Sequence, residues 1–96
     1  MVIDTSLMVI LPMTQQQISD FCVVSLANIL RLPQNTVAVD AKFARLGLDS
    51  AMIVYFMMEL EEKLDLELSP DDFYDNPTVN DLSRYLAHRQ ATRSAA

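Results

Sequence analysis

Four helix-start signals, spread along the chain, constrain its fold more than any other feature. Each is a residue whose side-chain oxygen can accept a hydrogen bond from the free N–H groups of a first helical turn. The four capping residues are Thr14, Asp49, Ser69 and Thr78. Together with the helix-breaking residues Pro33 and Pro77, they predict helices over about 14–31, 49–64, 69–76 and 78–89.

The composition agrees with helices and not with a sheet. The chain has one glycine in 96 residues, and β-branched residues do not alternate along it. Hydrophobic residues make up 51% of the chain, which is enough to build a folded core. We therefore expect an all-α fold, a small four-helix bundle with three main helices, one short third helix, and a long loop over 32–48 between helices one and two. Apolar side chains at irregular intervals should pin that loop to the core, namely Val37, Val39, Phe43 and Leu46.

Apolar residues at helical spacing predict which face of each main helix is buried. In the first helix these residues are Ile18, Phe21, Cys22, Ser25 and Ile29. In the second helix they are Ala51, Val54, Met57, Leu60 and Leu64, with Phe56 at the edge. In the last helix they are Val79, Leu82, Tyr85 and Leu86. The first two turns of the second helix are also apolar outside that face, at Met52, Ile53, Tyr55 and Met58. Either Met52, Tyr55 and Met58 belong to a docking surface, or Met52, Ile53 and Tyr55 pack under the 32–48 loop as ordinary core.

The four helices predict one domain over 14–89, preceded by a leader over 1–13 and followed by a frayed tail over 90–96. The leader has no Lys or Arg, and its continuous apolar run over 7–11 is too short for a secretory signal or a membrane span. It is either mobile or lies against the domain. The lone Cys22 cannot form an internal disulfide, so we expect a cytoplasmic protein, with a monomer as the default state.

Negative charge is concentrated in the second half of the chain. The net charge is −6, and Lys63 is the one base between positions 49 and 81. The ten acids in that stretch are Asp49, Glu59, Glu61, Glu62, Asp65, Glu67, Asp71, Asp72, Asp75 and Asp81. Such a surface repels phosphate backbones and anionic membranes, which excludes nucleic acid as a ligand. It favours partners with a basic docking patch, or else it only keeps the protein in solution.

The Ser50 hydroxyl is placed at the start of a helix, but no neighbouring base can activate it as a nucleophile. Ser50 stands at the start of the second helix, directly after the capping Asp49 and close to Gly47, whose backbone can turn with positive φ. The single histidine, His88, belongs to the last turn of the fourth helix, so no base is at hand to deprotonate Ser50. The chain also lacks a zinc-type cluster and a phosphate-binding glycine loop. We therefore expect no catalytic residue, no metal and no enzyme activity, and we interpret Ser50 as an attachment point.

The residues around Ser50 resemble the acyl carrier protein family. The resemblance covers roughly residues 17–88 and is strongest over 40–50, which reads Asp-Ala-Lys-Phe-Ala-Arg-Leu-Gly-Leu-Asp-Ser. The stretch Glu-Leu-Glu-Glu-Lys-Leu at 59–64 follows it. The resemblance implies that a phosphopantetheinyl transferase attaches 4′-phosphopantetheine from coenzyme A to Ser50. It also implies that the arm's thiol carries acyl or aminoacyl groups as thioesters. An acyl or aminoacyl ligase (adenylating enzyme) and an acyltransferase or synthase would then be partners acting in trans.

Two departures from the family pattern shape this expectation. Ala51 stands where leucine or isoleucine is usual, and Met52 and Tyr55 stand where fatty-acid carriers commonly have acids. The chain is in this respect similar to carriers of polyketide and nonribosomal peptide assembly. The expected docking face is Met52, Tyr55, Met58, Glu59 and Glu62. We expect a stand-alone carrier in a specialised polyketide, nonribosomal peptide or modified fatty acid pathway. The alternative is a helical protein-interaction module of the same fold without a prosthetic arm.

Overall fold

The computed structural model describes residues 12–95, with side chains up to Thr92, and this part of the chain folds as a bundle of helices without a strand. Its elements are α2 (Gln15–Leu30), the 3₁₀ turn η1 (Gln34–Thr36), α3 (Phe43–Leu46), α4 (Ser50–Leu64), α5 (Pro70–Asp75) and α6 (Val79–Ala95). The predicted all-α bundle is confirmed: α2, α4 and α6 are the three main helices and α5 is the short one. The predicted long loop holds two elements that its sequence does not announce, η1 and the single turn α3.

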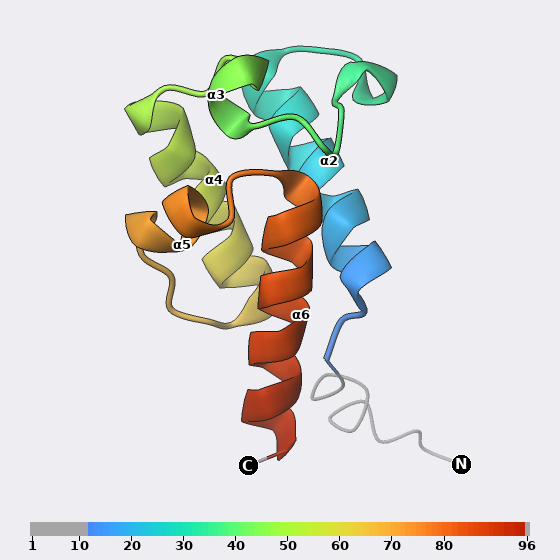
Figure 1. Cartoon of the computed structure of the whole chain (residues 1–96), viewed down its shortest axis with the longest axis vertical. Coiled ribbons are helices and arrows are strands. Elements are labelled where there is room, and N and C mark those ends of the chain that lie inside the picture. The colour runs from blue at the N-terminus through green and yellow to red at the C-terminus, as the bar shows by residue number, and fades with distance from the viewer. Residues whose placement is uncertain (1–11, 96) are drawn as a thin grey trace, which may run out of the picture.

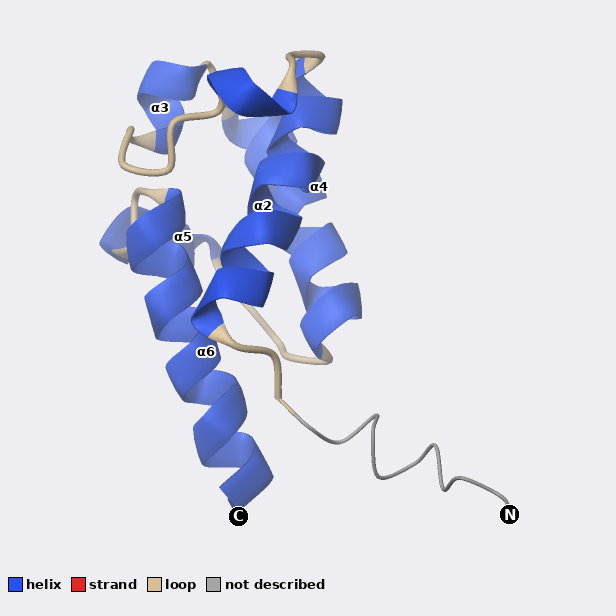
Figure 2. Ribbon diagram, turned by 90° about the vertical axis from the view of Figure 1, so that its right-hand side faces the viewer, coloured by secondary structure: helices blue, strands red, loops and turns tan. Residues whose placement is uncertain are grey.

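The long helix α2 packs against both α4 and α6 and runs antiparallel to them, and α5 packs against α4 (Figure 1). The segment between α2 and α4 crosses one end of the bundle, and α6 extends beyond the other end (Figures 1 and 2). The head of α4 therefore lies at the same end of the bundle as that segment. This end is where Ser50 is placed.

The predicted helix starts are confirmed by their hydrogen bonds. At α2, Thr14 Oγ1 accepts from the Gln17 N–H at 3.1 Å, and Gln17 Oε1 accepts from the Thr14 N–H at 2.9 Å. At α4, Asp49 Oδ1 accepts from the Met52 N–H at 2.9 Å. At α5 and α6 the pairs are Ser69 N–H to Asp72 Oδ2 at 2.8 Å and Asp81 N–H to Thr78 Oγ1 at 3.0 Å. Because these contacts are local, the sequence places all four starts within one residue.

The predicted buried face of α4 is confirmed in its second half, where Leu60 and Leu64 are buried, and is wrong in its first turns. Phe56 was expected at the edge and is fully buried, whereas Val54 was expected in the core and is 45% exposed. Ala51 is also exposed, and Met57 is only partly buried. The apolar residues encircle the first turns of this helix, so periodicity cannot choose a face there. Which side of α4 is buried depends on contacts with residues that are distant in the sequence.

Contacts among three phenylalanine rings determine which side of α4 is buried in its first turns. Phe43 of α3, Phe56 of α4 and Phe73 of α5 are all buried, with ring centroids 5.6 to 6.3 Å apart. Edge-on and tilted arrangements at such distances are the favourable ones for aromatic pairs. The ring cluster holds the two short helices against α4 beside the end that begins at Ser50.

The other predicted faces agree with the structure to different degrees. In α2, Ile18, Cys22 and Ser25 are buried as expected, Phe21 and Ile29 are partly buried, and the fully buried Leu26 was missed. In α6, Val79, Leu82 and Leu86 are fully buried and Tyr85 is partly buried. The loop is pinned as predicted, by the buried Val37 and Phe43 and the partly buried Val39 and Leu46.

The last helix does not end where the sequence predicts. It continues past Arg89 to Ala95, so His88 is exposed but is not in its last turn. Gln90, expected in a frayed tail, is only 7% exposed. Its Nε2 donates to the Leu64 carbonyl at 3.0 Å and its Oε1 accepts from the Met13 N–H at 2.8 Å. This amide joins α6 to the end of α4 and to the residue before the α2 cap.

The predicted leader falls mostly outside the described residues, which begin at Pro12. Among the helices that are described, none has both the length and the apolar character needed to cross a membrane.

Candidate functional site

Ser50 is the first residue of α4, and its side chain is exposed. Asp49 before it is in extended conformation, with φ −95° and ψ −179°, and its carboxylate is occupied by the Met52 N–H. Within residues 12–92, the Ser50 hydroxyl makes no hydrogen bond. The first turn of a helix has N–H groups without partners and carries partial positive charge. The site therefore presents an accessible hydroxyl where an anion would be stabilised.

The turn before α4 explains why this hydroxyl faces outward. Gly47 has φ 101°, in the left-handed region that glycine adopts without strain, as predicted. The next residue, Leu48, is buried, and its N–H donates to the Phe43 carbonyl at 3.1 Å. The chain is thus anchored at Leu48, and the following residues, Asp49 and Ser50, emerge at the surface.

A pocket of about 230 Å³ opens beside Ser50. Residues of α3, α4 and α5 line it, with Phe43, Leu48, Ile53 and Phe73 as apolar walls and Lys42 and Tyr74 as polar groups. The sequence reasoning missed this pocket, because its walls come from three segments that only the ring cluster brings together. The Asp40–Ser50 motif was the available signal, since it contains Lys42, Phe43 and Leu48.

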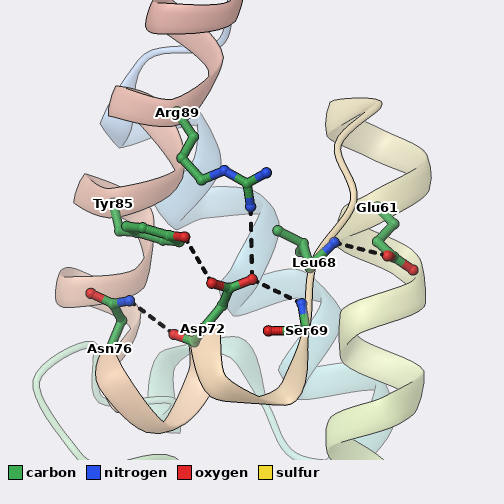
Figure 3. Close-up of polar contacts among 7 residues, drawn as sticks. All are labelled: Glu61, Leu68, Ser69, Asp72, Asn76, Tyr85 and Arg89. Carbon is green, nitrogen blue, oxygen red and sulfur yellow. Dashed lines mark hydrogen bonds and ion pairs between the residues drawn. The ribbon is translucent and has the colours of Figure 1, made fainter.

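One carboxylate fixes the position of α5 (Figure 3). Tyr85 Oη of α6 donates to Asp72 Oδ1 at 2.7 Å, and Arg89 Nη1 lies 3.7 Å from Asp72 Oδ2. Oδ2 also accepts from the Ser69 N–H, and the Asp72 carbonyl accepts from Asn76 Nδ2 at 2.9 Å. The hydrogen bond to Asp72, together with partial burial, raises the pKa of the Tyr85 phenol. Asp72 thus holds α5, and with it Phe73 and Tyr74, against α6.

A second set of backbone contacts ties the loop to the start of α6. The Phe43 N–H donates to the Pro77 carbonyl at 2.9 Å, and the Asn80 N–H donates to the Val39 carbonyl at 2.9 Å. Lys42 and Thr78 form an isolated bridge at the same place. These hydrogen bonds hold the α3 wall of the pocket in place, and the Asp72 contacts hold its α5 wall.

Of the residues predicted as a docking face, most are exposed and one packs against the core. Tyr55 is 66% exposed, Met58 is 56% exposed, and Glu59 and Glu62 are exposed. Met52 is partly buried and packs against the core, as does Ile53, so packing is the better description for these two. The exposed Val54 belongs with the outer face and was missed because the periodicity assigns it to the core. Along α4 this face is apolar near Ser50 and acidic further on.

The one cysteine lies in the core, away from Ser50. The Cys22 thiol is fully buried, and burial raises its pKa to about 12, so it is an inert part of the core. No group of three or more His, Cys, Asp or Glu side chains is arranged to hold a metal ion in the described part of the chain.

Comparison with known proteins shows the family of the chain. Residues 23–86 match the family described as the phosphopantetheine attachment site. One of the subunits of the phenolphthiocerol/phthiocerol polyketide synthase of Mycobacterium tuberculosis is 39% identical over 66 residues, which is 69% of this chain but 4% of that protein. The chain thus spans only a small part of this relative.

Two solved structures have the same fold. One is a free-standing peptidyl carrier protein from a secondary metabolic pathway of Acinetobacter baumannii, with a TM-score of 0.76, 32% identity, and coverage of 79% of this chain and 95% of that one. The other is the HMG-ACPI domain from the CurA module of Lyngbya majuscula, with a TM-score of 0.77, 30% identity, and coverage of 83% and 81%. The chain belongs to the phosphopantetheine attachment site family, a family of non-catalytic carrier proteins that occur in polyketide and peptide synthesis and whose cofactor is covalently attached phosphopantetheine.

Proposed function

We propose that Ser50 bears the 4′-phosphopantetheine arm and that the protein delivers acyl or aminoacyl groups on this arm to separate partner enzymes. The observation that carries the proposal is the exposed Ser50 hydroxyl, without a hydrogen-bond partner in the described chain, at the head of α4 and on the edge of a pocket. Ser50 also lies inside the family match over 23–86. The bound arm would supply a thiol on which acyl groups travel as thioesters.

The residues at this site fit a phosphodiester. A phosphodiester carries one negative charge, and the N-terminus of α4 favours an anion next to Ser50. Lys42 lines the same pocket as Ser50 and adds a positive charge on its edge. Attachment forms one bond, from Ser50 Oγ to phosphorus, and breaks the pyrophosphate bond of coenzyme A. The adenosine bisphosphate half leaves, and the hydroxyl proton passes to a base on the transferase, because no base of this chain is placed to take it.

We propose the outer face of α4 as the docking surface for partner enzymes. It consists of Tyr55, Met58, Glu59 and Glu62, with the addition of Val54 and with Met52 at its partly buried margin. Large exposed apolar side chains such as Tyr55 and Met58 are the kind that dominate binding energy at interfaces. The acids further along would pair with basic groups on a partner and fix its orientation. The partners we propose are the phosphopantetheinyl transferase, an acyl or aminoacyl ligase, and an acyltransferase or synthase.

We propose a stand-alone carrier, acting in trans in the cytoplasm on a specialised polyketide, nonribosomal peptide or modified fatty acid pathway. The free-standing carrier from Acinetobacter baumannii supports the stand-alone form by likeness. The apolar start of the α4 outer face supports a pathway other than bulk fatty acid synthesis. The lone, buried Cys22 is compatible with a reducing compartment.

Intact mass spectrometry tests the attachment. After incubation with coenzyme A and a transferase of broad specificity, the wild-type protein should gain the mass of one arm. Ser50→Ala should gain nothing. Ser69→Ala is the matched control, because Ser69 is also an exposed serine at a helix start, and this variant should load like the wild type. Wild-type protein that remains unmodified, while a known carrier is loaded in the same reaction, would favour the interaction module without an arm.

A further inference from the structure

We propose that the end of the bundle around Ser50 is a second docking surface, which takes an acidic patch of a partner protein. We call it the cationic end and define it by Arg31, Leu32, Lys42 and Arg45. The proposal rests on Ser50 as the attachment residue, because it concerns how a partner approaches that residue. It goes beyond the outer face of α4, since the two surfaces carry opposite charge and belong to different segments.

The bases of the cationic end differ from the other bases of the protein, because they have no partner within residues 12–92. The other bases with described side chains are Lys63, which lies over the Phe21 ring, Arg84, which lies 3.5 Å from Asp81, and Arg89, which lies 3.7 Å from Asp72. Arg31, Lys42 and Arg45 are exposed and make no ion pair, side-chain hydrogen bond or ring contact in that range. Their charges are therefore free to pair with acids of another protein.

The backbone brings these bases to the same end of the bundle as Ser50. The turn after α3 lies against the end of α2: a Cβ placed on Gly47 would be 3.9 Å from the last side chain of α2, and Arg31 follows that side chain directly. Lys42 caps the single turn of α3, and Arg45 lies inside that turn. Lys42 also lines the pocket that Ser50 lines. The three cations thus surround the approach to the head of α4 from the side of the loop.

Leu32 gives the cationic end an apolar component. It follows Arg31 directly and is 41% exposed. A partner that pairs with the neighbouring cations can bury this side chain at the same time, and apolar burial adds to the binding free energy. Arginine is enriched at protein interfaces, whereas lysine is depleted. We therefore assign most of the binding to Arg31, Leu32 and Arg45.

The charge of this end differs in sign from that of the whole chain. The segment 31–48 holds three bases and Asp40 as its one acid, which gives it a charge of +2, whereas the whole chain carries −6. An extended anionic surface, such as a membrane or a nucleic acid, is therefore repelled by the rest of the molecule. A protein that confines its acids to a small patch does not meet this repulsion. A partner protein is the occupant that fits.

The cationic end and the acids of α4 together fix the orientation of a partner. Glu59 is nine residues beyond Ser50, which is about 14 Å along a helix that rises by about 1.5 Å per residue. That separation exceeds the Debye length of about 8 Å in physiological salt, so a partner meets the two charges separately. A partner with acids opposite the cationic end and bases opposite Glu59 and Glu62 fits in one orientation only, because the reversed orientation brings like charges together.

Nuclear magnetic resonance of the unloaded protein with the synthetic peptide hexaglutamate tests the proposal. The peptide should shift the amide signals of Arg31, Leu32 and Arg45. Arg45→Gln should weaken its binding about threefold. Arg84→Gln is the matched control, because it removes one charge from an exposed arginine on α6, and it should leave the binding unchanged. Shifts of equal size around Arg84, or equal weakening by the two variants, would overturn the proposal.

Loading by the cognate ligase or synthase separates docking from a simple attraction of anions. Once mass spectrometry has established that the arm is bound, Arg45→Gln should raise KM about threefold at unchanged kcat, and added salt should reduce the difference from the wild type. An unchanged KM would overturn the docking role and leave the attachment at Ser50 intact. If Arg45→Gln does not fold by circular dichroism, Arg31→Gln takes its place in both experiments.

Two further comparisons make the outcomes distinguishable. The peptide experiment needs no arm, so a failure of attachment at Ser50 does not affect its result. Vesicles of phosphatidylserine offer the same negative charge on an extended surface, and the wild type should not bind them. Tighter binding to these vesicles than to hexaglutamate would overturn the protein partner in favour of a membrane.

Discussion

The Tyr85 hydroxyl of α6 lies 2.7 Å from the Asp72 carboxylate of α5, and this contact joins the short helix beside Ser50 to the longest helix of the bundle. The α5 wall of the pocket thereby depends on a residue of another helix. The carboxylate accepts this bond in a partly buried place, where hydrogen bonds to charged groups are stronger than between neutral ones.

Tyr85→Phe should lower the free energy of unfolding by about 1–2 kcal/mol, because it leaves the half-buried carboxylate without this donor. Urea denaturation measures the change. Tyr74→Phe is the control, since Tyr74 is exposed on α5 and its hydroxyl makes no hydrogen bond within residues 12–92. The control should change the stability by less than about 0.5 kcal/mol. Equal losses in both variants would show that the Asp72 contact does not stabilise the fold.

Ser25 and Ser83 are both buried, and we expect their replacement by alanine to change the stability in opposite directions. Ser25 Oγ is buried on α2 and has no hydrogen-bond partner among residues 12–92, whereas Ser83 Oγ on α6 donates to the Asn80 carbonyl at 3.1 Å. Ser25→Ala removes an unsatisfied polar atom and should stabilise the protein by up to about 1 kcal/mol. Ser83→Ala removes a satisfied one and should destabilise it by about 0.5–1.5 kcal/mol. Thermal unfolding of the two variants in one buffer measures the difference, and a more stable Ser83→Ala than Ser25→Ala would reverse this interpretation.

Cys22 should make the fold sensitive to alkaline pH. Burial raises the pKa of its thiol from the ordinary 9.0 to about 12, so between these values the thiol ionises in the unfolded chain but not in the folded one. Its contribution to stability is complete below pH 9.0 and is lost as the pH rises towards 12, at about 1.4 kcal/mol per pH unit. From neutral pH to about pH 10.5, the wild type should therefore lose about 2 kcal/mol more than Cys22→Ala. Urea denaturation at both pH values tests this, and parallel losses would contradict it.

Tyr55→Asp should slow loading by the cognate ligase or synthase about tenfold in kcat/KM, because it puts a charge into the apolar part of the proposed docking surface. The helical circular dichroism signal should hardly change, since Tyr55 is 66% exposed. Val24→Asp, at an exposed apolar residue on α2, is the control and should load at the wild-type rate. Equal rates for Tyr55→Asp and the wild type would remove Tyr55 from the docking surface.

The features that the sequence predicts well are those that depend on neighbouring residues. Thr14, Asp49 and Thr78 cap the helices that follow them because a side chain and the next turn are enough to make the contact. Gly47 takes its positive φ for the same local reason. The position of Ser50 at the head of α4 follows directly from Asp49 and Gly47, so the candidate attachment residue could be identified without a structure.

The features that it misses depend on contacts between distant residues. Periodicity places Phe56 at the edge of its helix because the rings of Phe43 and Phe73, which select its burial, lie in other segments. The end of α6 is predicted too early because Gln90 is polar, and only the structure shows its amide satisfied by Leu64 and Met13. The pocket beside Ser50 is missed because its walls also come from segments that are distant in the sequence.

Fragmentation mass spectrometry of the loaded protein tests the role of Ser50 most directly. Trypsin cuts after Arg45 and Lys63, and in the resulting peptide 46–63 the only hydroxyl groups belong to Ser50 and Tyr55. We predict that this peptide alone carries the arm and that the fragments place it on Ser50. An arm on any other residue, or a peptide 46–63 without an arm in a protein whose intact mass shows one, would contradict the assignment.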